Sequence, residues 1–237
     1  LQGLTSPVFL KTAGLMLRWV QRLGIEAVMR KTAKLFSRRL YNITRLAPRM
    51  DRRFFFEQLG TMAPAEGERR YRVAFFAGCI TNLSFSELNE ATVRVLARNG
   101  CEVVIPKDQV CCGALHVHSG VPDTARSLGR RNFKAFAELV DGGKLDAIIT
   151  NAAGCGSVLK EYPELFAEEK DLPAATKFSS RVRDVTEFLA EIGLSRKPGP
   201  VAVRATYQDP CHLGHAQRIR SAPRRLLRPH PTSPCRG

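Results

Sequence analysis

Residues 72–100 read RVAFFAGCITNLSFSELNEATVRVLARNG, and this stretch carries a clear fold signal. The apolar run at 73–76 lies just before a glycine, which is typical of a strand buried on both faces of a parallel sheet. A helix is expected next, because Ser84 with Glu87 three positions later has the spacing of a capping box. Gly100 is expected to end this helix. The stretch therefore predicts one strand–helix unit.

The same alternation continues along the chain. Further strands are expected at 103–105, 147–150 and 201–206, and further helices at about 123–140 and 180–192. Strands that alternate with helices indicate a parallel sheet with right-handed crossovers. The predicted fold class is α/β, with a parallel-sheet module preceded by basic helices.

Two further regions flank this module. Residues 6–46 predict two basic amphipathic helices with a break at Gly24. At the other end, residues 201–228 repeat the plan of strand, cysteine, turn and helix around Cys211, but the tail beyond them has no strand or helix pattern. We therefore divide the chain into a basic helical region (1–62), a linker (63–70), a first module (71–198) and an incomplete second module (199–237).

Positive charge is unevenly distributed along the chain. The formal net charge is +15, and residues 1–72 hold 15 basic and 5 acidic side chains, whereas residues 73–217 are nearly neutral. A core that bound nucleic acid would be basic, so we expect no nucleic-acid partner. The basic ends are typical of solvated helix faces, or of arms that contact an acidic partner subunit or an anionic membrane surface.

The cysteine content indicates a reducing compartment. Seven cysteines, two of them adjacent, argue against an extracellular disulfide framework and favour metal or redox chemistry. We accordingly expect a cytoplasmic protein. The most apolar segment, 8–20, is interrupted by Lys11 and Arg18, so no membrane span is predicted.

Four cysteines follow the ends of predicted strands. Cys79 follows the first strand, Cys111 and Cys112 follow the second, and Cys155 follows the third. Because ligands gather beyond the carboxyl ends of parallel strands, these four thiols are expected at one edge of the sheet. Cys101 instead opens the second strand, and a five-residue strand at about 3.3 Å per residue would hold it roughly 16 Å from that edge. We expect Cys101 to be a core residue.

The four thiols have the chemistry of a metal site. They satisfy the ligand requirement of a [4Fe–4S] cluster and equally that of a structural zinc ion. Adjacent cysteines are strained as disulfide partners, so Cys111 and Cys112 are more easily explained as ligands of a multinuclear centre. The glycines beside the cysteines permit the close backbone approach that a bulky cluster needs. Spacing alone leaves cluster, zinc and buried structural thiols as alternatives.

Other candidate residues are few. His116 and His118 follow the paired cysteines, and they are candidates either to tune the site or to stabilise the turn. His212 and His215 lie three apart beside Cys211, and without further ligands nearby they are interpreted as residues of a helix start. Because the sequence has no glycine-rich phosphate loop, nucleophile elbow or paired carboxylates at useful spacing, no catalytic residue is predicted.

The cysteine motifs resemble those of a known family. This family is the cysteine-rich CCG-domain family, which includes heterodisulfide reductase subunits, lactate-utilisation iron–sulfur proteins and the iron–sulfur subunit of glycolate oxidase. The resemblance is greatest to the glycolate oxidase subunit and covers nearly the whole chain. The motifs that carry it are FAGC (76–79), VCCGALHVHSG (110–120), TNAAGCGS (150–157) and QDPCHL (208–213).

The resemblance implies an iron–sulfur cluster, [4Fe–4S] before other types, on Cys79, Cys111, Cys112 and Cys155, with Cys211 as a further candidate metal ligand. It implies an electron-transfer subunit of a glycolate oxidase complex, which takes electrons from flavin-containing subunits and passes them to a downstream acceptor, with peripheral contact to the inner membrane. In the family a ferredoxin-like domain precedes the basic helices, so we expect the chain to be a fragment of a larger subunit.

One position departs from part of the family pattern. Some relatives end the first module with a Cys-x-x-Cys pair, whereas Val158 stands three residues after Cys155 in this chain. A fifth ligand is therefore missing, and a four-thiolate site is expected in preference to the disulfide-cleaving chemistry of heterodisulfide reductase. Two alternatives remain, a structural zinc-binding docking module and a thiol–disulfide redox subunit that uses Cys111 or Cys112. Cys235, in the C-terminal tail, is assigned no role.

Overall fold

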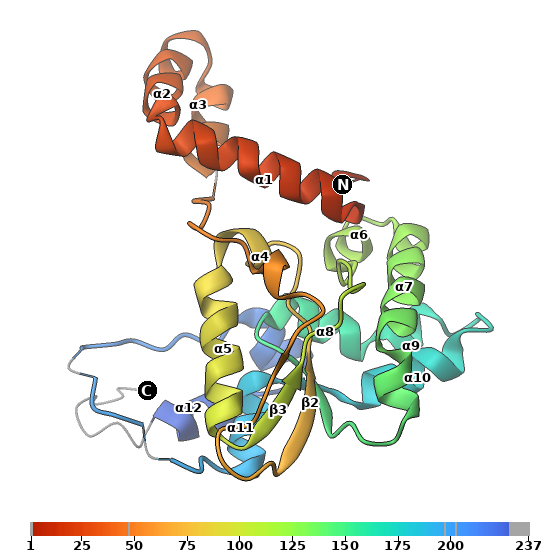
Figure 1. The fold of residues 1–237 in the computed structure, drawn as a ribbon. Coiled ribbons are helices and arrows are strands. Elements are labelled where there is room, and N and C mark those ends of the chain that lie inside the picture. Colours follow the sequence, from red (N-terminus) through yellow and green to blue (C-terminus); the bar gives the residue numbers. More distant parts are fainter. Residues whose placement is uncertain (1, 47, 197, 202, 228–237) are drawn as a thin grey trace.

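The computed structural model describes residues 2–46, 48–196, 198–201 and 203–227. An α/β body carries most of the chain, and three N-terminal helices lie beside it (Figure 1). The predicted α/β class is confirmed.

A single five-stranded sheet forms the centre of the body. Its strand order is β1-β3-β2-β4-β5, with β1 antiparallel to β3 and all other pairs parallel. Successive parallel strands lie on opposite sides of β2, so the chain changes direction there, which makes the carboxyl ends of β2 and β4 a topological switch point. The strands are β1 (Met62–Ala63), β2 (Tyr71–Phe75), β3 (Cys101–Val104), β4 (Ala147–Thr150) and β5 (Val182–Asp184).

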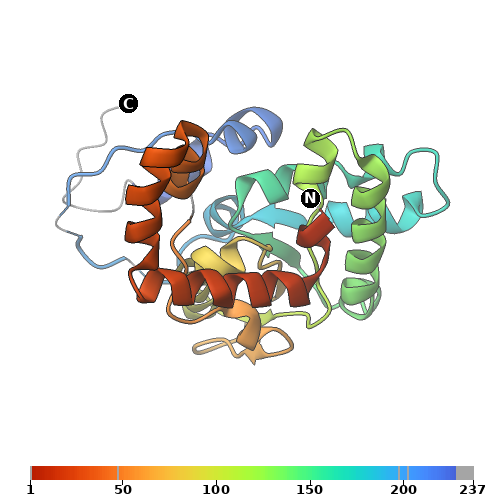
Figure 2. The ribbon, with the colours of Figure 1, turned by 90° about the horizontal axis from the view of Figure 1, so that it is seen from above.

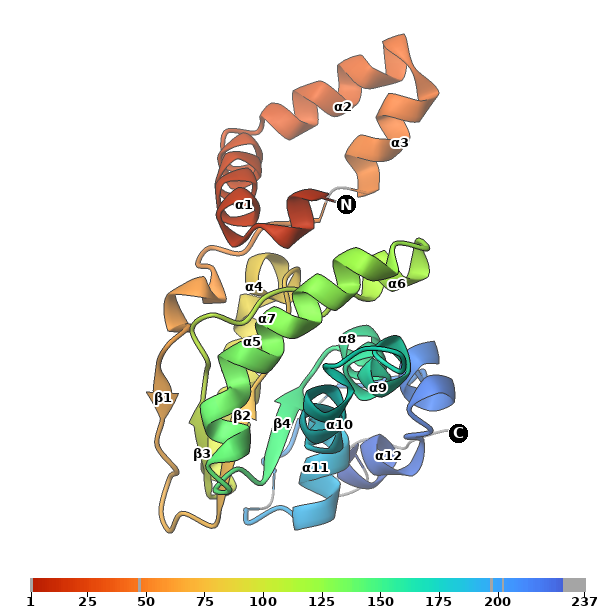
Figure 3. The same cartoon turned by 90° about the vertical axis from the view of Figure 1, so that its right-hand side faces the viewer.

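Helices cover both faces of the sheet (Figures 1 and 3). One face packs against α7, α8, α9 and α10, and the other packs against α5 and α11. The helices of the body are α4 (Thr81–Ser84), α5 (Ser86–Arg98), α6 (Ala114–His118), α7 (Pro122–Asp141), α8 (Ala153–Lys160), α9 (Tyr162–Leu165), α10 (Leu172–Ser180), α11 (Val185–Ile192) and α12 (Ser221–Leu227), with a π-helical turn η3 (His212–Ala216).

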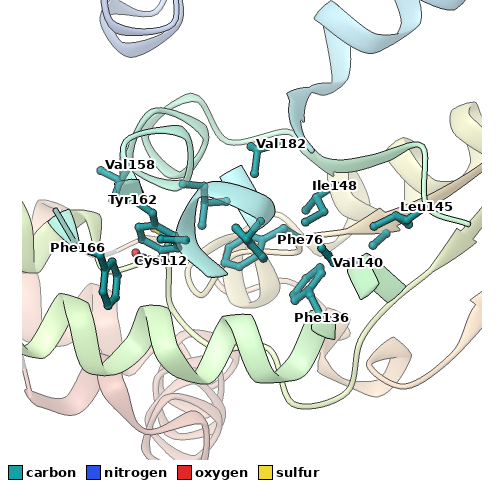
Figure 4. Close-up of a cluster of buried hydrophobic side chains, with 14 residues drawn as sticks. Phe76, Cys112, Phe136, Val140, Leu145, Ile148, Val158, Tyr162, Phe166 and Val182 are labelled. Carbon is teal, nitrogen blue, oxygen red and sulfur yellow. Dashed lines mark hydrogen bonds between the residues drawn. The ribbon is translucent and has the colours of Figure 1, made fainter. Parts of the chain in front are cut away.

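The alternation of side chains along β2 explains the two cores. Val73 and Phe75 belong to the core beneath α5 and α11, and Ala74 with the following Phe76 belongs to the core beneath α7 to α10. Phe76 stacks on Phe136 of α7 with ring centroids 6.1 Å apart (Figure 4). Burial of each such aromatic side chain contributes about 1.5–3 kcal/mol, so the apolar run fixes β2 at the centre of the sheet.

The N-terminal region contains three α-helices instead of the two that were expected. The expected break at Gly24 is confirmed. This residue lies between the first and the second helix, and its φ of 69° is incompatible with a continuous α-helix. The elements are η1 (Gln2–Thr5), α1 (Pro7–Arg22), α2 (Ile25–Phe36), α3 (Arg38–Leu46) and the short η2 (Phe55–Gln58).

Helix α1 lies across the body above α4 (Figure 2). Gly14 of α1 is in close contact with Leu83 of α4 and with Phe54, and Leu10 belongs to the same apolar cluster. The helix thereby covers part of the sheet edge at which the cysteine loops emerge.

Two predicted elements are wrong in position. Residue 202 of the strand expected at 201–206 lies outside the described residues; none of 201 and 203–206 is in a strand, and Val201 and Val203 are 45% and 55% exposed. Strand β5 already pairs with β4 at that edge of the sheet, and it lies inside the segment that was expected to be the 180–192 helix. Within that segment Ser180 ends α10, and residues 185–192 form α11 and are helical as predicted.

The capping box predicted at Ser84 is also wrong. Ser84 ends α4, and α5 begins two residues later, where the Asp51 carboxylate accepts hydrogen bonds from the Ser86 backbone N–H and hydroxyl group. A distant acidic side chain therefore caps this helix. A capping box is present instead at the start of α11, between Asp184 and Glu187.

Among the helices that the structure describes, none combines the length and the apolar character needed to cross a membrane.

Candidate metal centre

Three strands deliver cysteines to one edge of the sheet. Cys79 lies four residues after β2, Cys111 and Cys112 lie in the loop after β3, and Cys155 lies in the first turn of α8, directly after β4. These are the carboxyl ends of neighbouring parallel strands, which converge at the switch point. We call these four residues the cysteine rim.

The sulfur atoms of the cysteine rim are neighbours. The Sγ atoms of Cys79 and Cys111 are 3.5 Å apart, and the Cys112 thiol interacts with both Cys111 and Cys155. The Cys155 sulfur also lies 3.8 Å from the point that a Cβ atom on Gly78 would occupy, which places it against the Cys79 loop. Four thiols therefore meet at one place, although the first and the last of them, Cys79 and Cys155, are 76 residues apart in the sequence.

The cysteine rim is only partly open to solvent. Cys111 and Cys112 are buried, whereas Cys79 and Cys155 are half-buried. Cys79 and Cys111 line a cavity of about 800 Å³ between the start of α1, the loop before Cys111 and α7. One side of the rim is therefore accessible, and the other side is packed against the core.

Buried amide side chains fix the cysteine loops. Gln109 accepts a hydrogen bond from the Ala77 N–H at 2.8 Å and donates one to the Phe75 carbonyl at 3.2 Å. This side chain joins the loop after β3 to the loop after β2. Asn89 of α5 donates to the Ala77 carbonyl at 3.0 Å and accepts from the amide of Asn151 at 2.9 Å, which connects the loop after β4.

Two buried side chains hold the paired cysteines through hydrogen bonds to the backbone. Asn132 of α7 accepts from the Val110 N–H at 2.9 Å and donates to the Cys111 carbonyl at 3.2 Å. The Tyr162 hydroxyl donates to the Cys112 carbonyl at 2.8 Å (Figure 4). Both side chains are fully buried, so these bonds are shielded from competing water.

Sequence reasoning did not identify these supporting residues. Asn132 had a detectable signal, because it lies on the same face of α7 as Leu128 and Phe136, and a polar residue in an apolar stripe marks a buried hydrogen bond. Gln109 lies in an irregular loop whose periodicity carries no such signal.

Two glycines give the cysteine loops their shape. Gly78 and Gly113 have φ values of 72° and 86°, in the left-handed region that side chains disfavour. A Cβ atom on Gly113 would lie 3.1 Å from the Cα atom of Ala125, so α7 approaches the backbone closely there. The Gly113 N–H also points to the Cys111 sulfur at 3.4 Å.

The electrostatics of the rim favour a thiolate at Cys111. Hydrogen bonds from the Cys112 and Cys79 thiols, with smaller contributions from the Gly113 N–H and from His116, lower the pKa of Cys111. Hydrogen bonding to Cys111, followed by burial, raises the pKa of Cys79 well above its usual value. Hydrogen bonding to Cys111 and then to Cys155, followed by burial, raises the pKa of Cys112 in the same way. The first proton is thus lost from Cys111, and a bound cation would favour loss of the protons from Cys79 and Cys112.

This donor set fits an iron–sulfur group. Four thiols at one rim, a backbone N–H aimed at one sulfur, and a buried histidine with no hydrogen-bond partner are features of a site that surrounds an anionic sulfur cluster. Within the described ranges, no three or more histidine, cysteine, aspartate or glutamate side chains are arranged as a ligand set for a single metal ion.

The other cysteines lie elsewhere. Cys101 is fully buried at the start of β3, as expected for a core residue, and burial raises its pKa to about 12. Cys211 is exposed at the start of η3, and in the part of the chain that the structure describes no hydrogen bond joins its sulfur to another cysteine. Its role as a metal ligand stays a prediction. Cys235 lies outside the described residues.

The histidines divide into buried and exposed. His116 is 1% exposed, whereas His118 is exposed and its ring centroid lies 5.3 Å from that of His212. The His215 ring lies 3.3 Å from the Arg220 guanidinium.

Comparison with known proteins finds a family model and relatives named as an iron–sulfur subunit, a reductase subunit and a lactate utilization protein. Residues 73–160 match the cysteine-rich domain family CCG. A probable glycolate oxidase iron–sulfur subunit of Bacillus subtilis (strain 168) is 34% identical over 213 residues, 88% of this chain and 47% of that protein. A fumarate reductase (CoM/CoB) subunit of Methanothermobacter marburgensis is 37% identical over 66% of this chain and 29% of its own. Lactate utilization protein A of Geobacillus kaustophilus is 32% identical over 66% of this chain and 64% of its own.

The chain spans about half the length of the Bacillus subtilis relative and less than two thirds of the other two. No solved structure matches it. The matched family segment contains the whole cysteine rim, together with β3, β4 and all but the first two residues of β2. Residues 73–160 of this chain therefore belong to the cysteine-rich CCG domain family.

Proposed function

We propose that the cysteine rim binds an iron–sulfur cluster, of the [4Fe–4S] type, through Cys79, Cys111, Cys112 and Cys155. The observation that carries this proposal is the convergence of four thiols from three strands at one partly buried edge. Such a cluster supplies reversible one-electron chemistry when it is bound. The chain itself holds the ligands, limits access of water from the core side, and directs backbone N–H groups to sulfur.

We further propose that the protein is an electron-transfer subunit of an oxidoreductase complex. The names of the relatives support this role, because they are iron–sulfur or reductase subunits. The likeness to the glycolate oxidase subunit favours a complex in which flavin-containing subunits oxidise glycolate and pass electrons through this chain to a downstream acceptor. The half-buried Cys79 and Cys155 give the electron an exit or entry side.

A membrane-peripheral position in the cytoplasm is part of the proposal. Helix α1 exposes Val8, Met16 and Trp19 by 74%, 72% and 59% on a helix that also carries Lys11 and Arg18. Apolar side chains, an exposed tryptophan and basic residues are the combination by which helices lie at the surface of an anionic bilayer.

The decisive experiment is metal analysis of the full chain purified without oxygen. Iron and acid-labile sulfide in equal amounts, with absorbance near about 400 nm that dithionite bleaches, are the expected result. Cys112→Ser should lose most of this iron, whereas Cys101→Ser, whose side chain is buried at the opposite end of β3, should retain it. A colourless protein with one zinc ion per chain would replace the proposal with a structural zinc module.

A thiol–disulfide function is the second candidate, and the stabilised thiolate at Cys111 favours it. In that reaction the Cys111 thiolate attacks a disulfide, one S–S bond breaks, a mixed disulfide forms and the other sulfur leaves as a thiolate. Iron-free protein that forms a trapped mixed disulfide at Cys111, and not in Cys111→Ser, would establish this function. Failure to trap any adduct would dismiss it.

A further inference from the structure

His116 is a buried side chain without a partner. It is 1% exposed, and neither ring nitrogen has a hydrogen-bond partner among the described residues. A buried polar group without a partner costs free energy, so native proteins retain one mainly where a further group satisfies it. The backbone of His116 is fully used in α6, because its N–H donates to the Gly113 carbonyl and its carbonyl accepts from Val121. Only the ring is unexplained.

The position of His116 relates the ring to the cysteine rim. Helix α6 begins directly after Gly113, so His116 follows Cys112 by four residues. Helix α6 packs on α7 and on α8, and α8 carries Cys155. Two cysteine segments therefore border the site that His116 occupies.

We propose that His116 is a positioning residue that donates a ring N–H hydrogen bond to a sulfur atom of the bound cluster or to the Cys111 sulfur that ligates it. This inference rests on the proposed function. Reduction adds an electron to the cluster, and an N–H donor stabilises the more negative state. His116 thereby raises the reduction potential of the cluster and completes its own hydrogen bonding.

The chain offers a matched control within the same helix. His118 lies two residues later and is exposed, with its ring against His212. Loss of its imidazole removes the same chemical group from α6 but leaves the interior unchanged. The test variants are His116→Leu, which removes the donor, His116→Gln, which keeps an amide N–H, and His118→Leu.

The experiment is a redox titration of the cluster-loaded full chain, followed by absorbance and by electron paramagnetic resonance. For His116→Leu we expect the equilibrium constant of one-electron reduction to fall about tenfold, a potential about 59 mV more negative. His116→Gln should recover part of this change, and His118→Leu should match the wild type. Pulsed resonance of the wild-type cluster should show coupling to a histidine nitrogen or its exchangeable proton, which His116→Leu abolishes.

The outcomes separate the two proposals. Wild-type protein without iron would overturn the proposed function. A loaded wild type whose potential and couplings His116→Leu leaves unchanged would overturn the role of His116 alone. If His116→Leu fails to fold or load, the wild-type pulsed spectrum and His116→Gln decide the matter: absence of a histidine coupling, together with a Gln variant at the wild-type potential and coupling pattern, overturns the inference.

Discussion

Removal of one hydroxyl group tests whether the core holds the paired cysteines. In Tyr162→Phe the ring stays in its fully buried site, but the hydrogen bond to the Cys112 carbonyl is lost (Figure 4). The same hydroxyl accepts a weaker bond from Asn132 at 3.4 Å. Because a buried carbonyl is left without its donor, we expect the free energy of unfolding to fall by about 1–3 kcal/mol.

This loss is measurable by thermal or denaturant unfolding of the metal-free chain. For a chain of this size about 1 kcal/mol corresponds to a shift of about 2–4 °C in Tm, so the expected decrease is about 2–12 °C. The cluster-loaded variant should also release iron to a chelator faster than the wild type, because the Cys112 backbone has lost its anchor.

A second tyrosine serves as the control. Tyr71 packs edge-on against Phe188 and is half-buried, and no hydrogen bond of its hydroxyl is found within the described part of the chain. Tyr71→Phe should change the free energy of unfolding by less than about 0.5 kcal/mol. Equal effects of Tyr71→Phe and Tyr162→Phe would refute the idea that the Cys112 carbonyl depends on the buried hydroxyl.

Three further perturbations test the site and its surroundings. Gly113→Ala and Gly143→Ala both place alanine at positive φ, but only the first adds a contact at 3.1 Å to α7, so it should lose about 1–3 kcal/mol more in denaturant unfolding; equal losses would contradict the packing argument. Trp19→Ser should reduce co-flotation with anionic vesicles about tenfold, since the exposed ring is the expected anchor, and unchanged binding would remove α1 from the membrane proposal. In a pulse of iodoacetamide read by mass spectrometry, exposed Cys211 should react before Cys101, which, with its pKa of about 12 and full burial, should react only on unfolding; simultaneous labelling of these two cysteines in the native protein would show that the β3 end of the sheet opens.

The sequence predicted those strands whose own residues carry enough apolar character. Strand β4 has the expected bounds, and β2 and β3 differ from their expected positions by one or two residues. Strand β5 is the three residues Val182–Asp184, two of them charged, and its pairing with β4 is a tertiary choice that no local period reveals. The apolar run after residue 200 looked more like a strand, but no free edge beside β4 receives it.

The candidate site likewise contains residues that the sequence predicted and residues that it did not. Cysteine positions relative to strand ends were readable because the rule that ligands gather at carboxyl ends depends only on topology. The residues that hold the loops were not readable, because Gln109 and Tyr162 act through contacts with backbone groups 34 and 50 residues away. Their chemistry is ordinary for any core, and only the fold shows which carbonyl each one meets.

Neutral side chains anchor the loops of the cysteine rim. The groups that position the thiols are therefore different from the groups that set the charge around them. Gln109, Asn132 and Tyr162 bind backbone carbonyls and N–H groups without adding a formal charge beside the thiols. A lysine or carboxylate in their place would shift the thiol pKa values strongly in so buried a setting. The electrostatic environment of a bound cluster is therefore set mainly by its own thiolate ligands and by the hydrogen-bond donors that point at them. His116 is the buried donor best placed to adjust it, which is why its removal should alter the reduction potential, whereas loss of the Tyr162 hydroxyl should alter stability.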